Sequence, residues 1–84
     1  MQQSLSARWQ ASPQALVFNH QFADFAQAFA FLTRVAALAE AQDHHPEIWN
    51  LYHQVKLTLN THDAGNVVTH KDWALARDID ALLD

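Results

Sequence analysis

The feature that most constrains the fold is a pair of adjacent apolar stripes at helical spacing within residues 25–39. Asp24 can cap the start of a helix here. This helix must end before Pro46, because the proline ring disfavours the helical conformation at His45. The two stripes cover more than the roughly 100° of helix surface that one packing partner requires. We therefore expect a helix to about Gln42 that packs on a sheet and on a second subunit; the alternative is that both stripes belong to one core. The stripes are Phe25, Phe29, Leu32, Ala36 and Ala39, and Ala28, Phe31, Val35 and Leu38.

The other segments predict strands and a second helix. We expect strands at residues 9–10 and 15–22, and two strands or one bent strand over 49–52 and 55–61. A final helix begins at Thr69, where Thr69 and Asp72 have capping-box spacing. This order predicts an α+β fold, a four-stranded antiparallel sheet with helices packed on one face. We also expect core positions at Trp49, Tyr52, Trp73, Ala76, Ile79, Leu82 and Leu83.

Composition excludes several classes of function. The 84 residues allow a single domain over 1–84, in which half of the residues are apolar, and a chain this small gains stability from self-association. A net charge of -4 with scattered basic residues argues against nucleic-acid binding. The absence of cysteine removes disulfide and thiolate chemistry. Without a long apolar run or a leader-like N-terminus, we expect a cytoplasmic protein that does not enter membranes.

Titratable side chains gather where the first helix is predicted to end. Glu40 precedes His44 by four residues, which places both on one helix face, where the carboxylate can orient the imidazole. Asp43 and His45 also fall on the last turn. His62 follows the last predicted strand and reaches the same place only through the tertiary fold. Because imidazoles titrate near neutral pH, these residues are candidates for general acid–base catalysis.

The cluster also has less specific interpretations. A histidine at a helix end is often a cap or a solvated side chain. His44, His45 and His62 could ligate a metal ion, but adjacent histidines at a helix end point in different directions, and the sequence has neither an HExxH motif nor a cysteine. We therefore expect no metal site.

The spacing of the cluster resembles a known family signature. From Glu40 the chain reads Glu-x-x-x-His-His-Pro, and Tyr52, His62 and Asp72 follow after intervals of five, nine and nine residues. This pattern resembles that of the pterin-4a-carbinolamine dehydratases (4a-hydroxytetrahydrobiopterin dehydratases), small α+β proteins also known in animals as dimerisation cofactors of a homeodomain transcription factor. The similarity runs from about Trp9 to Asp80, with flanking matches at 22–25, 28–36 and 58–62.

The resemblance implies an enzyme, a carbon–oxygen lyase that dehydrates 4a-hydroxytetrahydropterin to quinonoid dihydropterin, a step that recycles the cofactor of aromatic amino-acid hydroxylases. It implies no cofactor, since the pterin is the substrate, and a homodimer or homotetramer. By position, His44 and His62 would be the acid/base pair, and His45 would contact the pterin and stabilise charge. Glu40 would orient the histidines or the pterin. The substrate pocket would be lined by the histidines together with Asp43, Asn60, Thr61 and Asp63.

The chain departs from the family pattern in two places. The family's N-terminal helix is expected to be shortened or absent, because only residues 1–8 precede Trp9. The turn over residues 63–69 is one residue longer than the common form. A competing hypothesis from a different class is a non-catalytic partner-binding or dimerisation module that uses the apolar helix faces of the same fold.

Overall fold

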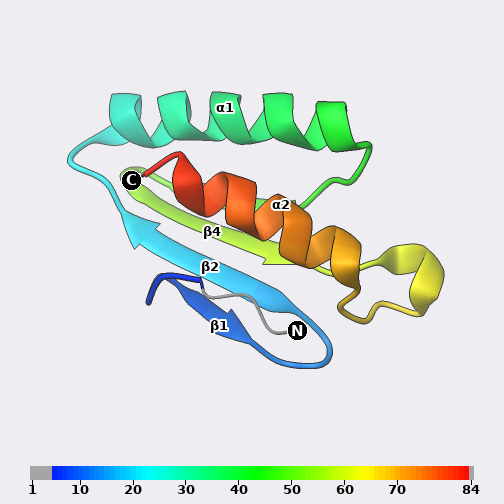
Figure 1. Cartoon of the computed structure of the whole chain (residues 1–84). Helices are drawn as coiled ribbons and strands as arrows, with labels where there is room; N and C mark the ends of the chain where they lie inside the picture. The colour runs from blue at the N-terminus through cyan, green and yellow to red at the C-terminus, as the bar shows by residue number, and fades with distance from the viewer. Residues whose placement is uncertain (1–4, 84) are drawn as a thin grey trace.

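One antiparallel sheet organises residues 5–83, the part of the chain that the computed structural model describes (Figure 1). In this part its strands are β1 (Trp9–Ala11), β2 (Leu16–Gln21), β3 (Glu47–Leu51) and β4 (Gln54–Leu59). Their spatial order is β1-β2-β4-β3, so β3 lies at one edge and β4 lies inside the sheet. The predicted α+β fold and element order are confirmed, and the segment that was expected to be one bent strand or two forms two strands, β3 and β4.

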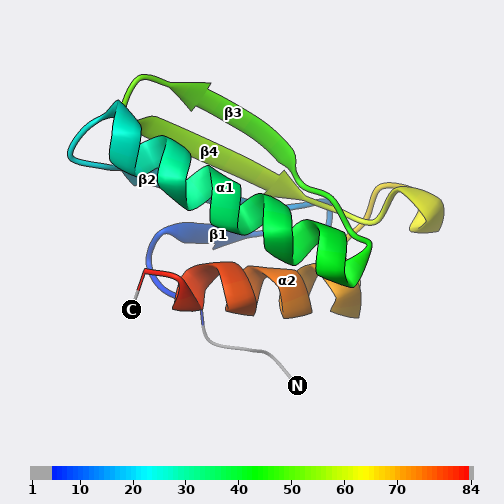
Figure 2. The same ribbon diagram turned by 90° about the horizontal axis from the view of Figure 1, so that it is seen from above.

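Both helices cover the same face of the sheet, as Figures 1 and 2 show. Helix α1 (Phe25–Gln42) begins where the Asp24 carboxylate accepts a hydrogen bond from the Gln27 N–H at 2.8 Å, and ends at Asp43. Helix α2 (His70–Ala81) lies beside it and begins after Thr69. The cap at Asp24 and the stop before Pro46 therefore set the bounds of α1 as the sequence predicts. In residues 5–83, neither helix is long and apolar enough to cross a membrane.

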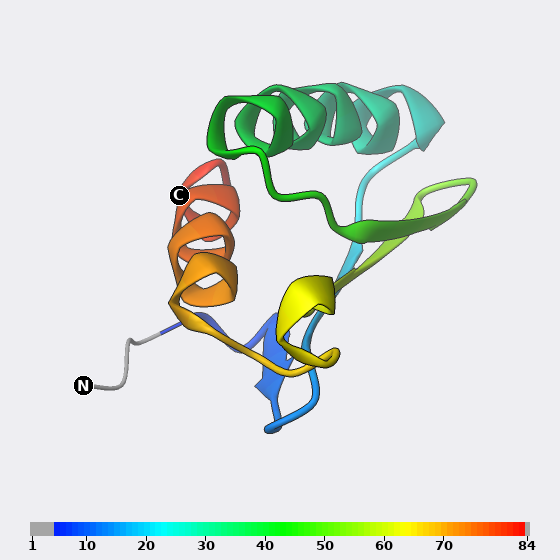
Figure 3. The ribbon, with the colours of Figure 1, turned by 90° about the vertical axis from the view of Figure 1, so that its right-hand side faces the viewer.

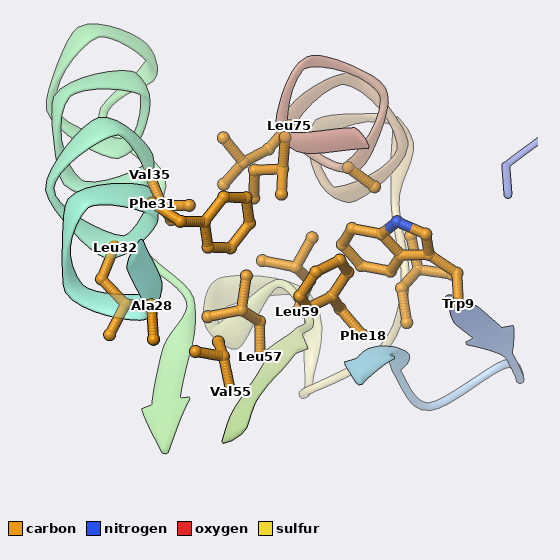
Figure 4. Packing of buried hydrophobic residues seen from close by; sticks show 13 residues of the cluster. Trp9, Phe18, Ala28, Phe31, Leu32, Val35, Val55, Leu57, Leu59 and Leu75 are labelled. Carbon is orange, nitrogen blue, oxygen red and sulfur yellow. The ribbon is translucent and has the colours of Figure 1, made fainter. Parts of the chain in front are cut away.

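The core lies between the sheet and the two helices (Figure 4). Alternate residues of the central strands point toward the helices, because successive side chains of a strand face opposite sides. The Phe18 ring of β2 stacks on the Phe31 ring of α1 with centroids 5.4 Å apart. The other members of this buried apolar cluster come from β1, β2, β4 and both helices: Trp9, Leu16, Ala28, Leu32, Val35, Val55, Leu57, Leu59, Leu75, Ala76 and Ile79.

Only the second predicted stripe of α1 is largely buried. Phe25 and Phe29 of the first stripe are about half exposed, at 48% and 53%, with ring centroids 5.6 Å apart. Ala36 is also exposed, whereas Leu32 and Ala39 are buried. The alternative that both stripes belong to one core is therefore wrong, because a helix packed on one sheet leaves its far side in solvent.

The predicted core also differs on β3 and α2. Trp49 and Tyr52 are 47% and 60% exposed, so their predicted burial is wrong; Trp49 belongs to the edge strand β3, and Tyr52 to the turn that follows it. On α2, Leu75 is fully buried although it was not predicted, and Trp73 is half-buried. Residues 5–8 form no helix, and the rest of the predicted N-terminal difference falls on residues 1–4, outside the described part of the chain.

Candidate active site

The titratable cluster lies at one end of the sheet, where α1 ends, β4 ends and α2 begins (Figures 1 and 3). After β4, a short 3₁₀ helix, η1 (His62–Ala64), precedes the loop to α2. A cavity of about 250 Å³ opens at this end. It is lined by Asp43, His44, His45, Asn60, Thr61, His62, Asp63 and Lys71.

The cavity brings together each residue that was expected to contact substrate. Their order along the chain gives no hint of this proximity, because residues 43–45 and 60–63 come from different elements. Lys71 completes the lining and was not predicted. Its position beside the capping residue Asp72, directly after the loop from η1, is the only signal in the sequence that could have placed it there.

The end of α1 separates His44 from His45. Asp43 adopts a left-handed conformation with φ 50° and ψ 44°, and its N–H donates to the carbonyl oxygens of Ala39 and Glu40. This conformation breaks the helical register, so the predicted stacking of Glu40 on His44 is wrong. The Glu40 carboxylate instead lies 2.7 Å from Nε2 of His45. Both of these side chains are more than half exposed, so solvent screens the interaction.

His44 points away from Glu40 and into the protein. Its Nε2 lies 2.5 Å from Oδ1 of Asp72, on the first turn of α2. The Asp72 side chain is fully buried, and the His44 side chain is only 12% exposed. A buried carboxylate requires hydrogen-bond donors to offset its lost hydration. Here His44 supplies one of these donors from a segment 28 residues away in the chain.

Two threonines supply the other donors to Asp72. Its Oδ2 accepts from the Thr69 N–H and from the Thr61 hydroxyl, both at 2.8 Å. The first of these bonds belongs to the capping box predicted at Thr69 and Asp72, which is confirmed. The Thr61 and Thr69 hydroxyl oxygens are 2.6 Å apart. Asp72 therefore joins the start of α2, the end of β4 and His44 in one buried network.

His62 also lines the cavity, and it is exposed to solvent. It begins η1, where Thr61 is held by a backbone bridge to Val67. Nδ1 of His62 lies 3.0 Å from the side-chain oxygen of Asn66. With the amide oxygen as acceptor, this contact favours the neutral ring that is protonated at Nδ1.

The arrangement can exchange protons with a small ligand. Three imidazoles, those of His44, His45 and His62, line one cavity, and each has one ring nitrogen in contact with a neighbouring side chain. A volume of about 250 Å³ is slightly below the roughly 300–1,000 Å³ of pockets for drug-sized ligands, so it suits a bicyclic ring. Among residues 5–83, no three metal-ligating side chains are grouped as a metal ion would require.

Comparison with known proteins identifies related sequences. Residues 1–82 match the model of the family described as pterin 4 alpha carbinolamine dehydratase. A Synechococcus protein is 53% identical over 74 residues, which cover 88% of this chain and 78% of the relative. A protein from Paraburkholderia xenovorans is 49% identical over 76 residues, covering 88% and 78%. Both relatives are named for pterin-4-alpha-carbinolamine dehydratase activity only provisionally.

Two solved structures share the fold. One is described as a transcriptional coactivator/pterin dehydratase from Brucella melitensis; it has a TM-score of 0.85 and 39% identity, and the match covers 93% of this chain and 84% of that one. The other is a pterin dehydratase-like protein identified as a RuBisCO assembly factor in the alpha-carboxysome, with a TM-score of 0.70 and 34% identity over 89% of this chain and 86% of that one. The fold therefore occurs with more than one described role.

Proposed function

Because the chain belongs to the pterin 4 alpha carbinolamine dehydratase family, we propose that it dehydrates a 4a-hydroxytetrahydropterin to the quinonoid dihydropterin. In this reaction an acid protonates the 4a-oxygen, and the C4a–O bond breaks with its electron pair leaving as water. A base removes the N5 proton, and the N–H electron pair forms the C4a=N5 double bond. One proton is consumed and one is released, so the reaction needs a proton donor and a proton acceptor but no redox group.

The observation that carries the proposal is the shared cavity of His44 and His62. Hydroxide is a poor leaving group, so protonation of the 4a-oxygen must accompany cleavage, and an imidazole can supply that proton near neutral pH. A second imidazole facing the same ligand can accept the N5 proton. The two histidines reach the same cavity from different elements, which supports their assignment as the two proton-transfer groups.

The surrounding side chains suit binding of the pterin ring. We assign His45 to contact with the pterin and to charge stabilisation, with Glu40 as the partner of its Nε2. Pterin rings carry several hydrogen-bond donors and acceptors, and carboxylates, hydroxyls and amides can satisfy both kinds. The polar residues assigned to ring binding are Asp43, Asn60, Thr61 and Asp63.

The proposal is tested by adding the purified protein to a phenylalanine hydroxylase reaction, which releases a 4a-hydroxypterin. The absorbance of this intermediate should decay faster in proportion to the protein added. The His44→Ala variant should lose about 10²- to 10⁴-fold of the acceleration, the usual contribution of general acid–base catalysis. Decay that does not change when the wild-type protein is added would refute the proposal.

A second candidate function is that of a non-catalytic binding module. Two observations favour it: large apolar side chains are exposed on α1 and β3, and a solved structure with this fold is described as an assembly factor. This role requires the exposed apolar surface but not the histidines. A pull-down that captures a stoichiometric partner, lost in Phe29→Glu and retained in His44→Ala, would support the module. Acceleration of dehydration that is lost in His44→Ala supports the enzyme.

We further propose that the protein forms a homo-oligomer through β3 and the exposed face of α1. β3 is an edge strand, so one row of its backbone N–H and C=O groups lacks a partner within the sheet. Ile48, Trp49 and Leu51 on this strand are 47–58% exposed. Phe25 and Phe29 of α1 add a second exposed apolar surface. Pairing two copies antiparallel would satisfy the edge and bury these side chains.

Light scattering coupled to size-exclusion chromatography tests this assembly. Phe29→Glu places a charge within the apolar face of α1 and should shift the protein to a smaller species. Gln27→Glu adds the same charge at an exposed position of α1 and serves as the matched control. A wild-type protein that is monomeric at micromolar concentration contradicts the proposed assembly.

A further inference from the structure

The geometry points to a positioning role for Asp72: we infer that it holds His44 in the tautomer with Nε2 protonated, so that Nδ1 is the nitrogen that exchanges protons in the cavity. The catalytic consequence rests on the proposed dehydratase function. Asp72 does not line the cavity and therefore acts through His44. The capping box by itself would explain an aspartate at position 72. The cap, however, uses only one of the two carboxylate oxygens of Asp72.

The two carboxylate oxygens of Asp72 have separate tasks. Oδ2 accepts from the Thr69 N–H and the Thr61 hydroxyl, which fixes the plane of the carboxylate at the start of α2. The Thr61 hydroxyl has one proton, which it gives to Asp72, so the Thr69 hydroxyl must donate to Thr61. The two hydroxyl hydrogen bonds therefore run in one direction, from Thr69 to Thr61 and from Thr61 to the Asp72 carboxylate. Oδ1 is then left for His44 at 2.5 Å.

This contact determines the tautomer of His44. A carboxylate can only accept hydrogen bonds, so Nε2 must carry a proton whenever His44 faces Asp72. In the neutral ring Nδ1 is then unprotonated. His44 lines the cavity, and its Nε2 is occupied by a fully buried side chain. Nδ1 is therefore the ring nitrogen available to accept a proton from a bound substrate or to return one.

An Asp72→Asn variant is expected to invert this arrangement. The Thr69 N–H and the Thr61 hydroxyl both donate, so the amide oxygen must take the place of Oδ2 to keep the cap. The amide NH₂ then faces Nε2 of His44 as a donor. Nε2 must become the acceptor, and the proton of the neutral ring moves to Nδ1. The variant keeps the shape and the cap but presents the wrong tautomer to the cavity.

Nuclear magnetic resonance of protein labelled with ¹⁵N-histidine reads the tautomer directly. Spectra are recorded at about pH 8.5, above the usual titration range of histidine, and His44 is assigned by its loss in His44→Ala. The wild-type protein should show His44 protonated at Nε2, and Asp72→Asn should show it protonated at Nδ1. In the dehydration assay, Asp72→Asn should lower kcat by about 10²- to 10⁴-fold with little change in KM.

Asp24→Asn is the matched control. Asp24 caps α1 with its carboxylate and lies in an exposed position that is not part of the cavity, and asparagine caps helices as well as aspartate does. The control should leave both the His44 tautomer and kcat unchanged. A wild-type His44 protonated at Nδ1, or a tautomer that is unchanged in Asp72→Asn, overturns the inference.

The NMR measurement of the His44 tautomer tests this inference independently of the dehydration assay that tests the proposed function. If the wild-type protein fails to accelerate dehydration, the proposed function fails, and the spectra still decide whether Asp72 positions His44. If Asp72→Asn does not fold, the wild-type spectrum alone decides, because a ring protonated at Nδ1 contradicts the contact with Asp72.

Discussion

Replacing His62 with alanine should remove most of the activity and almost none of the stability. If His62 transfers a proton, the His62→Ala variant loses about 10²- to 10⁴-fold in kcat, which is about 2.7–5.5 kcal/mol of transition-state stabilisation. The loss should appear in kcat more than in KM, because proton transfer stabilises the transition state rather than the bound substrate.

The structure indicates why the stability cost is small. The His62 side chain is exposed and takes part in one side-chain hydrogen bond, to Asn66. Its backbone carbonyl oxygen, which accepts from the Gly65 N–H at 3.0 Å, is retained in the variant. Exposed substitutions of this kind change the free energy of unfolding by up to about 0.5 kcal/mol. The kinetic loss is therefore several times larger than any loss of folding free energy.

Two measurements on the same preparation test this reasoning: decay of the 4a-hydroxypterin for kcat, and urea denaturation for the free energy of unfolding. His70→Ala is the control, because His70 is an exposed histidine at the start of α2 that does not line the cavity. It should retain wild-type kcat. A His62→Ala variant with wild-type kcat, or one whose loss of activity is explained by unfolding, would refute the role of His62.

Three further predictions concern stability. Burial, followed by the charge of Arg8, lowers the pKa of His20 from its ordinary value of 6.5. The contribution of His20 to stability is therefore full above pH 6.5 and is lost as the pH falls through the lower pKa of the folded state. In thermal unfolding, the melting temperature of His20→Leu should fall less over this pH range than that of the wild type. Burial would raise the pKa of Asp80, but hydrogen bonds from Ser6 and the Arg8 guanidinium lower it below 3.8. Asp80→Asn should therefore cost about 1–2 kcal/mol at neutral pH, a difference that shrinks as urea titrations approach the acid range; an equal cost at every pH would contradict it. Leu75→Ala, at a fully buried position, should cost about 2–5 kcal/mol in urea denaturation, and a cost below about 1 kcal/mol would contradict its place in the core.

Local signals predicted the helices and the fold class well. Asp24 and Pro46 act within a few residues of the helix ends that they set, and the Thr69 capping box likewise depends only on neighbouring residues. The alternation of the apolar Val55, Leu57 and Leu59 with polar residues similarly reports which side of one strand is buried. These features depend on backbone preferences and periodicity, so a single sequence contains them.

Features that depend on tertiary contacts could not be predicted in the same way. Trp49 pairs with the exposed Lys56 of β4 and therefore points to the face of the sheet that no helix covers, which is a property of strand register rather than of β3 itself. The pairing of Glu40 with His45 follows from the left-handed conformation of Asp43. The contact of His44 with Asp72 joins residues that are 28 positions apart. The sequence named the lining residues other than Lys71, but not which of them contact one another.

The most direct test of the account is a turnover measurement with a large molar excess of 4a-hydroxytetrahydropterin over protein. A catalyst that uses His44 and His62 as proton-transfer groups is regenerated in each cycle, so it should convert many equivalents of substrate at a rate proportional to protein concentration. A protein that only binds the pterin would remove at most one equivalent of substrate per binding site from solution. Multiple turnovers that are lost in His62→Ala are the predicted result. No conversion beyond one equivalent, or a rate equal to the spontaneous one, would contradict the account.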